Sequence, residues 1–375
     1  MKVSIGSKIF EGPWGGGNLF VKNLKNYLES KGVKVIFDLY DADIDLIVLT
    51  DPRKSSYSST YTHKDIMNYL KYINEKAVVV QRFNECDERK NTKDVNNFMI
   101  QANVCSDKNI FVSNWLEEIY KRSGLTDKEN QIIMTGADKE IFNNKDFHKW
   151  DEKSKFRIVT HHWGTNINKG FNEYKKLDSF IGEGDNSKTF EFTFIGNLPE
   201  DFEFIHSNHI EPLHGKNLSN ELKRHHLYLT ASKNEPSGNH HIEAAQCGLP
   251  ILYLNSGGIP EFCKGFGLPF DEKNFFESLY EIKENYFDYR EKVKSYPYDA
   301  NKMCKEYYDL ILDLIEKRDL YVEKRILSNP QLIENYSYFL FKQTFGRLIH
   351  RNKLLHNFYN YLIRGYLKFK SIIIK

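Results

Sequence analysis

The chain has 375 residues, of which 40% are hydrophobic and 28% are charged, proportions that are ordinary for a soluble globular enzyme. This length is enough for two domains that each bury a core of their own. The formal net charge of +2 is too small to indicate a nucleic-acid partner, so we expect none.

Five cysteines are scattered through the chain, and no two of them form a Cys-x-x-Cys pair. They are Cys86, Cys105, Cys247, Cys263 and Cys304. Their odd number and spacing argue against a disulfide framework and a zinc site, and favour thiols in a reducing compartment. Ser7 and Lys8 interrupt the N-terminal apolar run, so no secretory signal is predicted. No stretch approaches the roughly 20 apolar residues of a membrane span. We therefore expect a cytoplasmic protein.

The first half of the chain alternates short apolar runs with amphipathic stretches. A strand is predicted at residues 3–9, followed by a glycine-rich loop and a helix at residues 19–30. Further short strands rich in β-branched residues are predicted at residues 33–37, 45–49, 77–81, 109–112 and 131–134. Ser113 and Asn114 are predicted to cap a helix at residues 115–122.

Two loops of this half follow predicted strands and are candidate binding loops. The first consists of Gly15, Gly16, Gly17 and Asn18. It opens a helix, and glycines there let the backbone approach a phosphate or a sugar closely. Its spacing matches neither a GxGxxG fingerprint nor a Walker loop. In the second loop, Arg82 and Asn84 follow the strand at residues 77–81, and we expect both to line the same cleft, near the acceptor.

A polar, charged stretch at residues 143–155 predicts a hinge, after which the alternation resumes. Strands are predicted at residues 156–161, 190–195, 227–231 and 251–254, and helices at residues 170–180, 218–224, 239–247 and 301–315. Repeated strand–helix units favour a parallel sheet with helices on both faces, here twice. The sequence therefore predicts an α/β protein with domains at residues 1–145 and 146–318 and a tail at residues 319–375.

The most informative segment is residues 235–250, which follows a predicted strand and opens the helix at residues 239–247. Ser237, Gly238 and Asn239 lie at the helix N-terminus, where free backbone N–H groups attract a phosphate. Glu235 precedes this helix and Glu243 lies about one turn into it, so both carboxylates can face one crevice. Carboxylates accept hydrogen bonds from vicinal hydroxyls without needing a metal.

This segment resembles the Glu-x7-Glu motif of retaining glycosyltransferases with the GT-B fold, particularly those of glycosyltransferase family 4. Three other stretches agree with that family's motifs and follow in the same order. They are residues 133–138 (Ile-Met-Thr-Gly-Ala-Asp) with Phe142, Lys169 with Gly170, and residues 256–261 (Ser-Gly-Gly-Ile-Pro-Glu). The resemblance implies the GT-B architecture, in which two Rossmann-like domains with parallel sheets face each other across a cleft.

The resemblance also implies roles for individual residues. Glu243 would hold the ribose hydroxyls of a nucleotide-sugar donor, Glu235 would touch the transferred sugar, and Lys169 would meet the donor diphosphate. The other donor-binding positions of the motifs are Ser237, Gly238, Asn239, Gly257 and Gly258. The glycine loop of the first domain would face the acceptor and the donor phosphate. The acceptor would be a carbohydrate or a lipid-linked carbohydrate, as in cell-surface polysaccharide or glycolipid synthesis.

One feature of the family pattern is missing. The family has an arginine about six residues before the lysine, but residues 161–166 read His-His-Trp-Gly-Thr-Asn. Either a histidine, with His162 as the candidate, supplies the second positive charge, or backbone groups stabilise the leaving group. We expect Gly164 and Thr165 of the same segment to contact the donor.

No metal and no cofactor are expected, and the nucleotide sugar serves as a co-substrate. His240 and His241 are adjacent in sequence, which is unsuitable for paired metal ligation on one helix face. Two alternatives remain open. One is a nucleotide-sugar epimerase of the same fold, which would turn over the donor without an acceptor. The other is a non-catalytic GT-B scaffold subunit, for which the missing arginine is the main argument.

The C-terminal tail has a composition of its own. After Glu334 there is no acidic residue, but there are eight Lys or Arg and ten Tyr or Phe residues. One apolar helical stripe consists of Leu348, Leu355, Tyr359, Leu362, Tyr366, Phe369 and Ile373. Two interpretations are open: a helix packed on a neighbouring surface or subunit, or residues 337–375 lying on an anionic membrane at the inner face of the cell.

Overall fold

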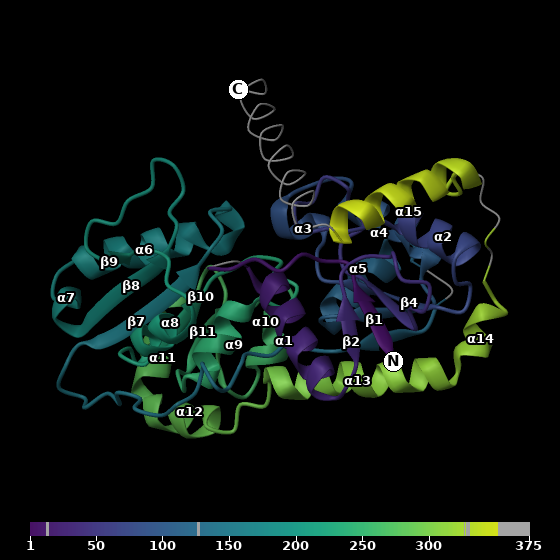
Figure 1. Cartoon of the computed structure of the whole chain (residues 1–375). Coiled ribbons are helices and arrows are strands. Elements are labelled where there is room, and N and C mark those ends of the chain that lie inside the picture. Colours follow the sequence, from purple (N-terminus) through teal and green to yellow (C-terminus); the bar gives the residue numbers. More distant parts are fainter. Residues whose placement is uncertain (13–14, 126–127, 326, 328–330, 352–375) are drawn as a thin grey trace.

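The computed structural model describes residues 1–12, 15–125, 128–325, 327 and 331–351. Within them the chain forms two α/β units, each built on a six-stranded parallel sheet flanked by helices (Figure 1). The fold class predicted from the repeated strand–helix alternation is therefore confirmed. The domain limits at residues 145 and 318 stay predictions.

The first unit has the strand order β2-β1-β3-β4-β5-β6. Its strands are β1 (Lys2–Ile5), β2 (Lys34–Ile36), β3 (Leu46–Leu49), β4 (Val78–Phe83), β5 (Lys108–Phe111) and β6 (Asn130–Ile132). Its helices are α1 (Gly16–Ser30), α2 (His63–Tyr72), α3 (Asp87–Lys90), α4 (Val95–Ala102) and α5 (Asn114–Arg122), with a 3-10 turn at η1 (Asn103–Cys105). The predicted cap of α5 is present, because the Ser113 side chain accepts a hydrogen bond from the backbone N–H of Leu116.

The second unit has the strand order β12-β11-β10-β7-β8-β9. Its strands are β7 (Phe156–His162), β8 (Phe190–Gly196), β9 (Asn208–Ile210), β10 (Leu227–Thr230), β11 (Ile251–Leu254) and β12 (Gly267–Phe270). Its helices are η2 (Ile167–Lys169), α6 (Phe171–Gly182), α7 (Asn186–Thr189), α8 (Gly215–Leu222), α9 (Asn239–Gln246), α10 (Ile259–Cys263), α11 (Phe275–Glu284), α12 (Tyr286–Val293) and α13 (Ala300–Glu316).

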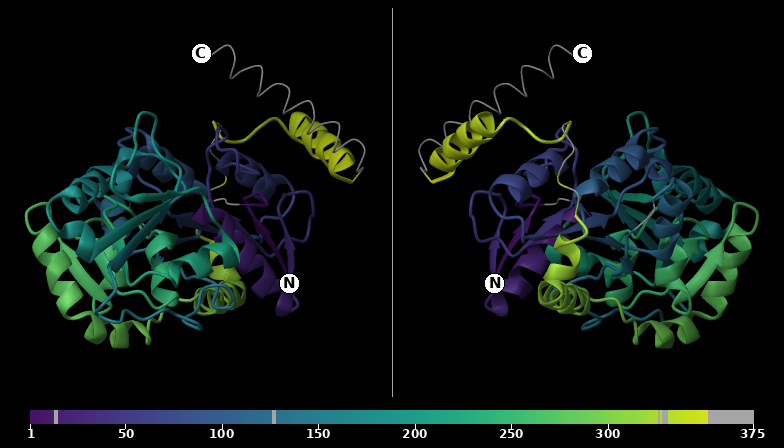
Figure 2. Two further views of the ribbon diagram at one scale, coloured as in Figure 1. Left: turned by 90° about the vertical axis from the view of Figure 1, so that its left-hand side faces the viewer. Right: turned by 90° about the vertical axis from the view of Figure 1, so that its right-hand side faces the viewer.

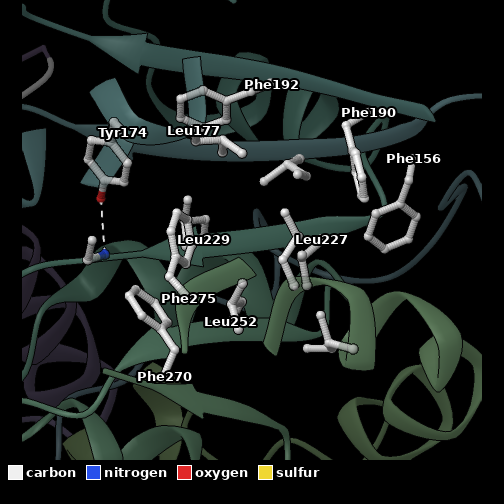
Figure 3. Close-up of a cluster of buried hydrophobic side chains, with 14 of the residues drawn as sticks. Phe156, Tyr174, Leu177, Phe190, Phe192, Leu227, Leu229, Leu252, Phe270 and Phe275 are labelled. Carbon is white, nitrogen blue, oxygen red and sulfur yellow. Dashed lines mark hydrogen bonds between the residues drawn. The ribbon is translucent and has the colours of Figure 1, made fainter. Parts of the chain in front are cut away.

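Aromatic side chains fill the core of the second unit (Figure 3). Phe156, Phe190 and Phe192 come from β7 and β8 and are at most 1% exposed. They face Leu227 and Leu229 of β10, which are fully buried. These alternate positions of parallel strands point to one face of the sheet, where the hydrophobic effect drives helix packing.

Helix α13 leaves the second unit and packs on the first. Its residues Met303, Tyr307 and Ile311 are at most 3% exposed and belong to the same hydrophobic cluster as Phe20 of α1. The amphipathic pattern at residues 301–315 predicted this helix, and the structure shows which surface its apolar stripe covers. Helix α13 therefore ties the two units together.

Strands β9 and β12 were not predicted from the sequence. Both lie at the edges of the second sheet, β9 is mostly exposed, and β12 contains Pro269. Edge strands lack the apolar run that marks a buried parallel strand, and proline is tolerated there because one side of the strand needs no partner.

The C-terminal tail begins with α14 (Arg318–Val322) and continues with α15 (Tyr336–Arg351), which lies along the first unit (Figures 1 and 2). Phe339 of α15 is 3% exposed, and its ring centroid lies 5.3 Å from that of Tyr72 in α2. Of the predicted stripe, only Leu348 lies within the described residues. The others, Leu355, Tyr359, Leu362, Tyr366, Phe369 and Ile373, lie outside them. No helix in the described part of the chain is both long and apolar enough to span a membrane.

Each sheet has one point at which the strand order reverses direction. In the first sheet β1 lies between β2 and β3, and in the second sheet β7 lies between β8 and β10. The loops that leave the carboxyl ends of such neighbouring strands diverge to opposite faces, and ligands of open α/β sheets bind in the crevice between them. The topology therefore directs attention to the loops after β1, β7 and β10.

Candidate active site

Two loops of the second unit meet at its switch point. Lys169 lies in the loop that follows β7, and Glu235 lies in the loop that follows β10. The two side chains form an ion pair, and their exposed fractions are 16% and 5%. The sequence predicted both residues for the site, and the parallel sheet brings them together across 66 residues of chain.

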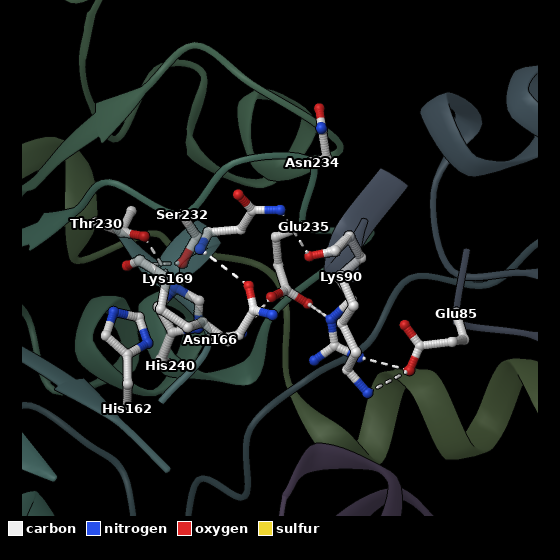
Figure 4. Close-up of polar contacts among 12 residues, drawn as sticks. Glu85, Lys90, His162, Asn166, Lys169, Thr230, Ser232, Asn234, Glu235 and His240 are labelled. Atoms are coloured by element: carbon white, nitrogen blue, oxygen red, sulfur yellow. Dashed lines mark hydrogen bonds and ion pairs between the residues drawn. The ribbon is translucent and has the colours of Figure 1, made fainter. Parts of the chain in front are cut away.

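A third charged group reaches this pair from the first unit. The guanidinium Nε of Arg89, in α3, lies 3.1 Å from the second carboxylate oxygen of Glu235. Arg89 also contacts Glu85, with 3.0 Å between Nη1 and the carboxylate, and Lys90 contacts the same oxygen of Glu85 at 3.1 Å. Figure 4 shows Glu235 between Lys169 and the segment that carries Lys90 and Glu85.

The electrostatics of this cluster keep Glu235 ionised. Burial on its own would raise the pKa of the carboxyl group, but the charges of Arg89 and Lys169 outweigh that effect and lower the pKa to about 2. Burial lowers the pKa of Lys169, and the attraction of Glu235 opposes this shift. Removing either cation would leave the buried carboxylate with less compensation, which is costly in a low-dielectric interior.

Glu243 is held by a separate contact within the second unit. It is 5% exposed, and its carboxylate lies 3.0 Å from Nε2 of His161, the residue next to His162 at the end of β7. The other ring nitrogen of His161 lies 3.2 Å from the hydroxyl of Tyr228. His161 therefore sets the orientation of a carboxylate that the sequence assigned to a ribose.

The N-terminus of α9 faces the glycine loop of the first unit. Helix α9 begins at Asn239 with Gly238 as its N-cap at φ +70°, and its first turn contains no acidic residue. A Cβ on Gly16 would lie 2.9 Å from the side-chain carbon of Asn239, so the two loops touch. Ser237, Gly238 and Asn239 thus stand where free N–H groups and the helix dipole favour an anion.

Gly257 and Gly258 lie directly under the Glu235 loop. The N–H of Gly258 donates to the carbonyl of Glu235 at 2.9 Å. A Cβ on Gly257 would lie 2.6 Å from the backbone nitrogen of Glu235, and one on Gly258 would lie 2.2 Å from the carbonyl oxygen of Pro236. Both glycines therefore permit the close packing that supports Glu235, whereas the contact with a donor stays a prediction.

Residues 161–166 stand where family 4 has its arginine, and they include a buried histidine and a more exposed stretch beside Lys169. Nε2 of His162 lies 2.7 Å from the hydroxyl of Tyr174, and burial together with Lys169 lowers the pKa of His162 well below its usual value. Burial and Lys169 therefore disfavour a charged ring at His162, which favours the alternative in which backbone groups stabilise the leaving group, and a catalytic role of His162 stays a prediction. Gly164 lies beside Lys169, because a Cβ on this glycine would lie 4.0 Å from the lysine Cε, and Thr165 is exposed.

The residues of the first unit that were predicted to line the site differ in burial and in the contacts they make. Arg82 is 4% exposed, and its guanidinium lies 4.0 Å from the ring centroid of Phe20, packed between α1 and α13. Asn18 exchanges two hydrogen bonds of 2.9 Å with the backbone of Phe10 and thereby braces its own loop. Gly15 and Gly17 are exposed, and Asn84 is half-buried just beyond β4.

Further contacts hold the two units together around the site. The carboxylate of Glu261 accepts hydrogen bonds from the backbone N–H groups of Asn114 and Trp115, at 2.9 and 2.7 Å, and so caps α5 across the interface. Arg89, His161 and Glu261 lie in segments that the sequence indicated, but none of the three was singled out there as a site residue. For Arg89 the available signal was its position eight residues after Gln81, the predicted end of a buried strand that points into the cleft.

The charged side chains of the interdomain site pair with one another. Among the described residues, no group of three or more His, Cys, Asp or Glu side chains is placed to hold a metal ion. A surface depression of about 650 Å³ lies elsewhere, over α6 and α11, between Lys176 and Phe276. It contains none of the residues discussed above.

Comparisons with known proteins identify the architecture. No model of a protein family matches the sequence, and no curated protein matches it. Among solved structures, the catalytic domain of starch synthase IV from Arabidopsis thaliana, bound to ADP and acarbose, matches with a TM-score of 0.63 at 12% identity over 84% of this chain and 99% of that one. HepE of Anabaena in complex with UDP matches with a TM-score of 0.61 at 12% identity over 84% of this chain and 100% of that one.

A third match is WaaG, a glycosyltransferase involved in lipopolysaccharide biosynthesis, with a TM-score of 0.57 at 12% identity over 83% of this chain and 99% of that one. At such low identity these likenesses show the fold alone. The chain has the GT-B fold, as its resemblance to family 4 implied.

Proposed function

We propose that this protein is a glycosyltransferase that moves a sugar from a nucleoside-diphosphate sugar to a carbohydrate or lipid-linked carbohydrate acceptor. The observation that carries the proposal is the ion-paired Lys169 and Glu235 beside the N-terminus of α9, at the switch point of the second sheet. Solved proteins of the same fold, HepE with UDP-glucose and starch synthase IV with ADP, support a nucleotide-sugar donor.

The arrangement suits the departure of a nucleoside diphosphate from an anomeric carbon. As the bond between that carbon and the phosphate oxygen breaks, negative charge grows on the diphosphate. The Lys169 ammonium and the N–H groups of Ser237–Asn239 at the N-terminus of α9 are fixed donors for that charge, which is the most effective electrostatic device in catalysis. We assign Glu243 to the ribose hydroxyls and Glu235 to the transferred sugar, with retention of configuration and without a metal.

The two alternative functions of the fold make different predictions. An epimerase would convert the donor with no acceptor present. A non-catalytic scaffold would bind the donor without turnover, and Glu235→Gln would change nothing that can be measured. The contact of Arg89 with Glu235 weakens the argument for a scaffold, because a second cation stands at the site although the family arginine is missing.

The test is a thermal-shift screen of nucleoside-diphosphate sugars, followed by transfer assays with the donor that stabilises the protein most. A ligand that binds only the folded state raises the melting temperature in proportion to its affinity and concentration. We expect acceptor-dependent release of the nucleoside diphosphate by the wild type, and strong loss in Glu235→Gln when both proteins are assayed well below their melting temperatures, so that both are folded. Stabilisation by no donor, or equal turnover by wild type and Glu235→Gln, would contradict the proposal.

We further propose that α15 places this enzyme on an anionic membrane surface, where a lipid-linked acceptor would lie. Four residues of α15 share one helical face and are strongly exposed. They are Tyr338, Phe341, Phe345 and Leu348, with exposed fractions of 57%, 64%, 56% and 59%. The opposite face is docked, because Phe339 packs on Tyr72 and Lys342 pairs with Glu334 at 3.0 Å. An outward aromatic face in a region without acidic residues fits an interfacial helix.

Liposome sedimentation tests this placement. The double variant Phe341→Ser and Phe345→Ser keeps Phe339 and the docking face, so it should fold as the wild type does. We expect wild-type protein to sediment with vesicles containing phosphatidylserine, and the double variant and a chain stopped before Ser337 to lose this binding. Equal sedimentation of all three would favour a packing role for α15.

A further inference from the structure

We infer that Arg89 is a catalytic residue supplied by the first domain, and that it contacts the diphosphate of the donor opposite Lys169. The inference rests on the proposed function and adds to it a residue that no motif of the sequence indicated. It also implies that the cationic site is complete only when the two domains are closed on each other.

Helix α3 docks on the two loops that carry Lys169 and Glu235. The side-chain amide of Asn168 donates to the backbone carbonyl of Arg89 at 3.2 Å, and that of Asn234 donates to the carbonyl of Glu88 at 3.3 Å. Each asparagine immediately precedes a site residue, so the two hydrogen bonds fix the position of α3 relative to both loops. In this position the guanidinium of Arg89 lies beside the Glu235 carboxylate.

The second domain by itself brings little positive charge to the site. The histidines nearest to Lys169 are His162, His240 and His241, and all three are buried. Burial lowers the pKa of His162 and of His240 well below the usual value and lowers that of His241 to about 3. These rings are neutral at physiological pH, so Lys169 is the cation that the second domain itself brings to Glu235. A leaving diphosphate needs more compensation than one ammonium group provides.

The contacts that Arg89 already makes are those of an anion-binding group. The Glu235 carboxylate stands between Arg89 and Lys169, in the position of an oxyanion held by two cations. Nη1 of the guanidinium donates a hydrogen bond to Glu85, whereas the buried Nε lies 3.1 Å from the Glu235 carboxylate without a hydrogen-bond partner, and Nη2 donates no hydrogen bond among the described residues. Arginine presents its donors as a planar fork that suits phosphate oxygens. A bound diphosphate would share these donors while Glu235 turns to the hydroxyls of the sugar.

Because the two cations belong to different domains, binding of a diphosphate would be coupled to closure of the domains. Lys169 belongs to the second domain and Arg89 to the first, with the interface between them. A diphosphate held by both would bridge the domains, so binding and closure would stabilise each other. Arg89 would thereby fill the role that the sequence left open when it lacked an arginine before Lys169.

The test compares Arg89→Met and Arg89→Lys with Lys90→Met, which removes a neighbouring cation that pairs with Glu85 and not with Glu235. The probes are inorganic pyrophosphate, UDP and ADP, and the corresponding monophosphates UMP and AMP, titrated by calorimetry. We expect Arg89→Met to weaken binding of the better diphosphate roughly 10- to 100-fold, the effect of one charge-assisted hydrogen bond, and of its monophosphate about twofold. Arg89→Lys should restore part of the loss, and Lys90→Met should stay within about threefold of wild type.

Transfer kinetics and melting temperatures complete the test. With a turned-over donor, Arg89→Met should lower kcat and not only raise KM, because the contact strengthens as charge develops. A merely structural Arg89 would lower the melting temperature and weaken mono- and diphosphates equally, which would overturn the inference. Equal loss in Lys90→Met would overturn it as well.

Failure of the proposed function would be recognised separately. If wild type binds pyrophosphate and Arg89→Met does not, while no nucleotide sugar is turned over, the anion site at Arg89 stands and the transferase proposal fails. If wild type transfers sugar and Arg89→Met is indistinguishable from it, the transferase proposal stands and the role of Arg89 is refuted. Absence of binding of every diphosphate to wild type would refute both.

Discussion

The switch points of the two sheets are alike in topology and different in chemistry. At the carboxyl ends of the second sheet's strands, the loops carry Lys169 and Glu235, which form an ion pair, and Glu243 of the following helix α9 pairs with His161. At the carboxyl end of β1 in the first sheet, the corresponding loop carries glycines, and the Asn18 side chain is hydrogen-bonded to the backbone of Phe10. One domain therefore brings charged side chains, and the other brings mainly backbone and close approach.

The difference shows how the site divides its tasks. Charged side chains anchored on β7 and β10 are positioned by a rigid sheet, which is where precise geometry is most easily kept. The first domain contributes through a short docked helix, whose Arg89 crosses the interface. If the chemistry is as unequally distributed as the side chains, substitutions in the two domains should differ in the size of their effects.

The largest loss of activity is expected when Lys169, the cation of the second domain, is replaced. Lys169→Met should reduce kcat by about 10²- to 10³-fold, the usual consequence of deleting one fixed donor to a developing oxyanion. Lys188→Met serves as the matched control, because Lys188 is 76% exposed and its ion pair within the described part of the chain is with the surface residue Asp185, so the kcat of this variant should be unchanged. Steady-state kinetics with a saturating donor measure both. A Lys169→Met enzyme with wild-type kcat would break the assignment of the charged chemistry to the second domain.

The next effect concerns donor affinity. Glu243→Gln should raise the dissociation constant of the preferred nucleoside diphosphate about 10- to 100-fold, because a charged acceptor for ribose hydroxyls is lost. The loss should shrink to about twofold when the probe is the 2′,3′-dideoxy nucleotide, which lacks those hydroxyls. Calorimetric titration of both nucleotides gives the comparison. An equal loss for both probes would mean that Glu243 acts through His161 and the fold, not through the ribose.

A stability comparison separates glycines that permit close packing from glycines that do not. Gly258→Ala places a Cβ 2.2 Å from the carbonyl oxygen of Pro236 and 2.8 Å from Oγ of Ser113, so the Glu235 loop must move. We expect a loss of about 1–3 kcal/mol in unfolding free energy together with reduced transfer. Gly17→Ala meets nothing within 4 Å inside α1 and should be neutral or stabilising by up to about 1 kcal/mol. Urea unfolding of both variants decides whether they differ.

The smallest effect is a difference in acid stability. The folded-state pKa of Glu235, about 2, lies below its ordinary value of 4.5, so its contribution to stability is present above pH 4.5 and is lost as pH falls toward 2. Glu235→Gln cannot titrate, so its melting temperature should fall less steeply than that of wild type between about pH 5 and pH 3. Parallel curves for the two proteins would show that the two cations do not hold the carboxylate ionised.

Much of the fold could be predicted because the signals are local. The short apolar run at β11 predicted Ile251–Leu254 with both limits correct, and the helix predicted to open at Asn239 begins there as α9. Both are features of a few consecutive residues. The edge strands β9 and β12 were missed because an edge needs little hydrophobic burial and so leaves little pattern in the sequence.

The candidate site was predicted unevenly for a related reason. Lys169 and Glu235 were named through the resemblance to glycosyltransferase family 4, and the parallel sheet brings them together because neighbouring strands place their carboxyl ends side by side. Arg82 was also expected to follow a strand, but it lies within β4, and its guanidinium packs on Phe20 and against α13, a helix that comes much later in the chain. The end of a predicted strand indicates where a residue lies in the sheet. The orientation of a long side chain depends on neighbouring residues that are distant in the sequence.

The amino-acid sequence by itself determined the two parallel sheets and the loops that can reach a ligand, because these follow from periodicity and from short-range capping and turn chemistry. The roles of the acidic and basic residues of the second domain were inferred from the resemblance to glycosyltransferase family 4. Only the tertiary structure decided that Glu235 lies between Lys169 and Arg89, that His161 orients Glu243 and that His162 is buried and neutral. Charge compensation and burial depend on which groups meet across an interface, and no stretch of consecutive residues contains that information.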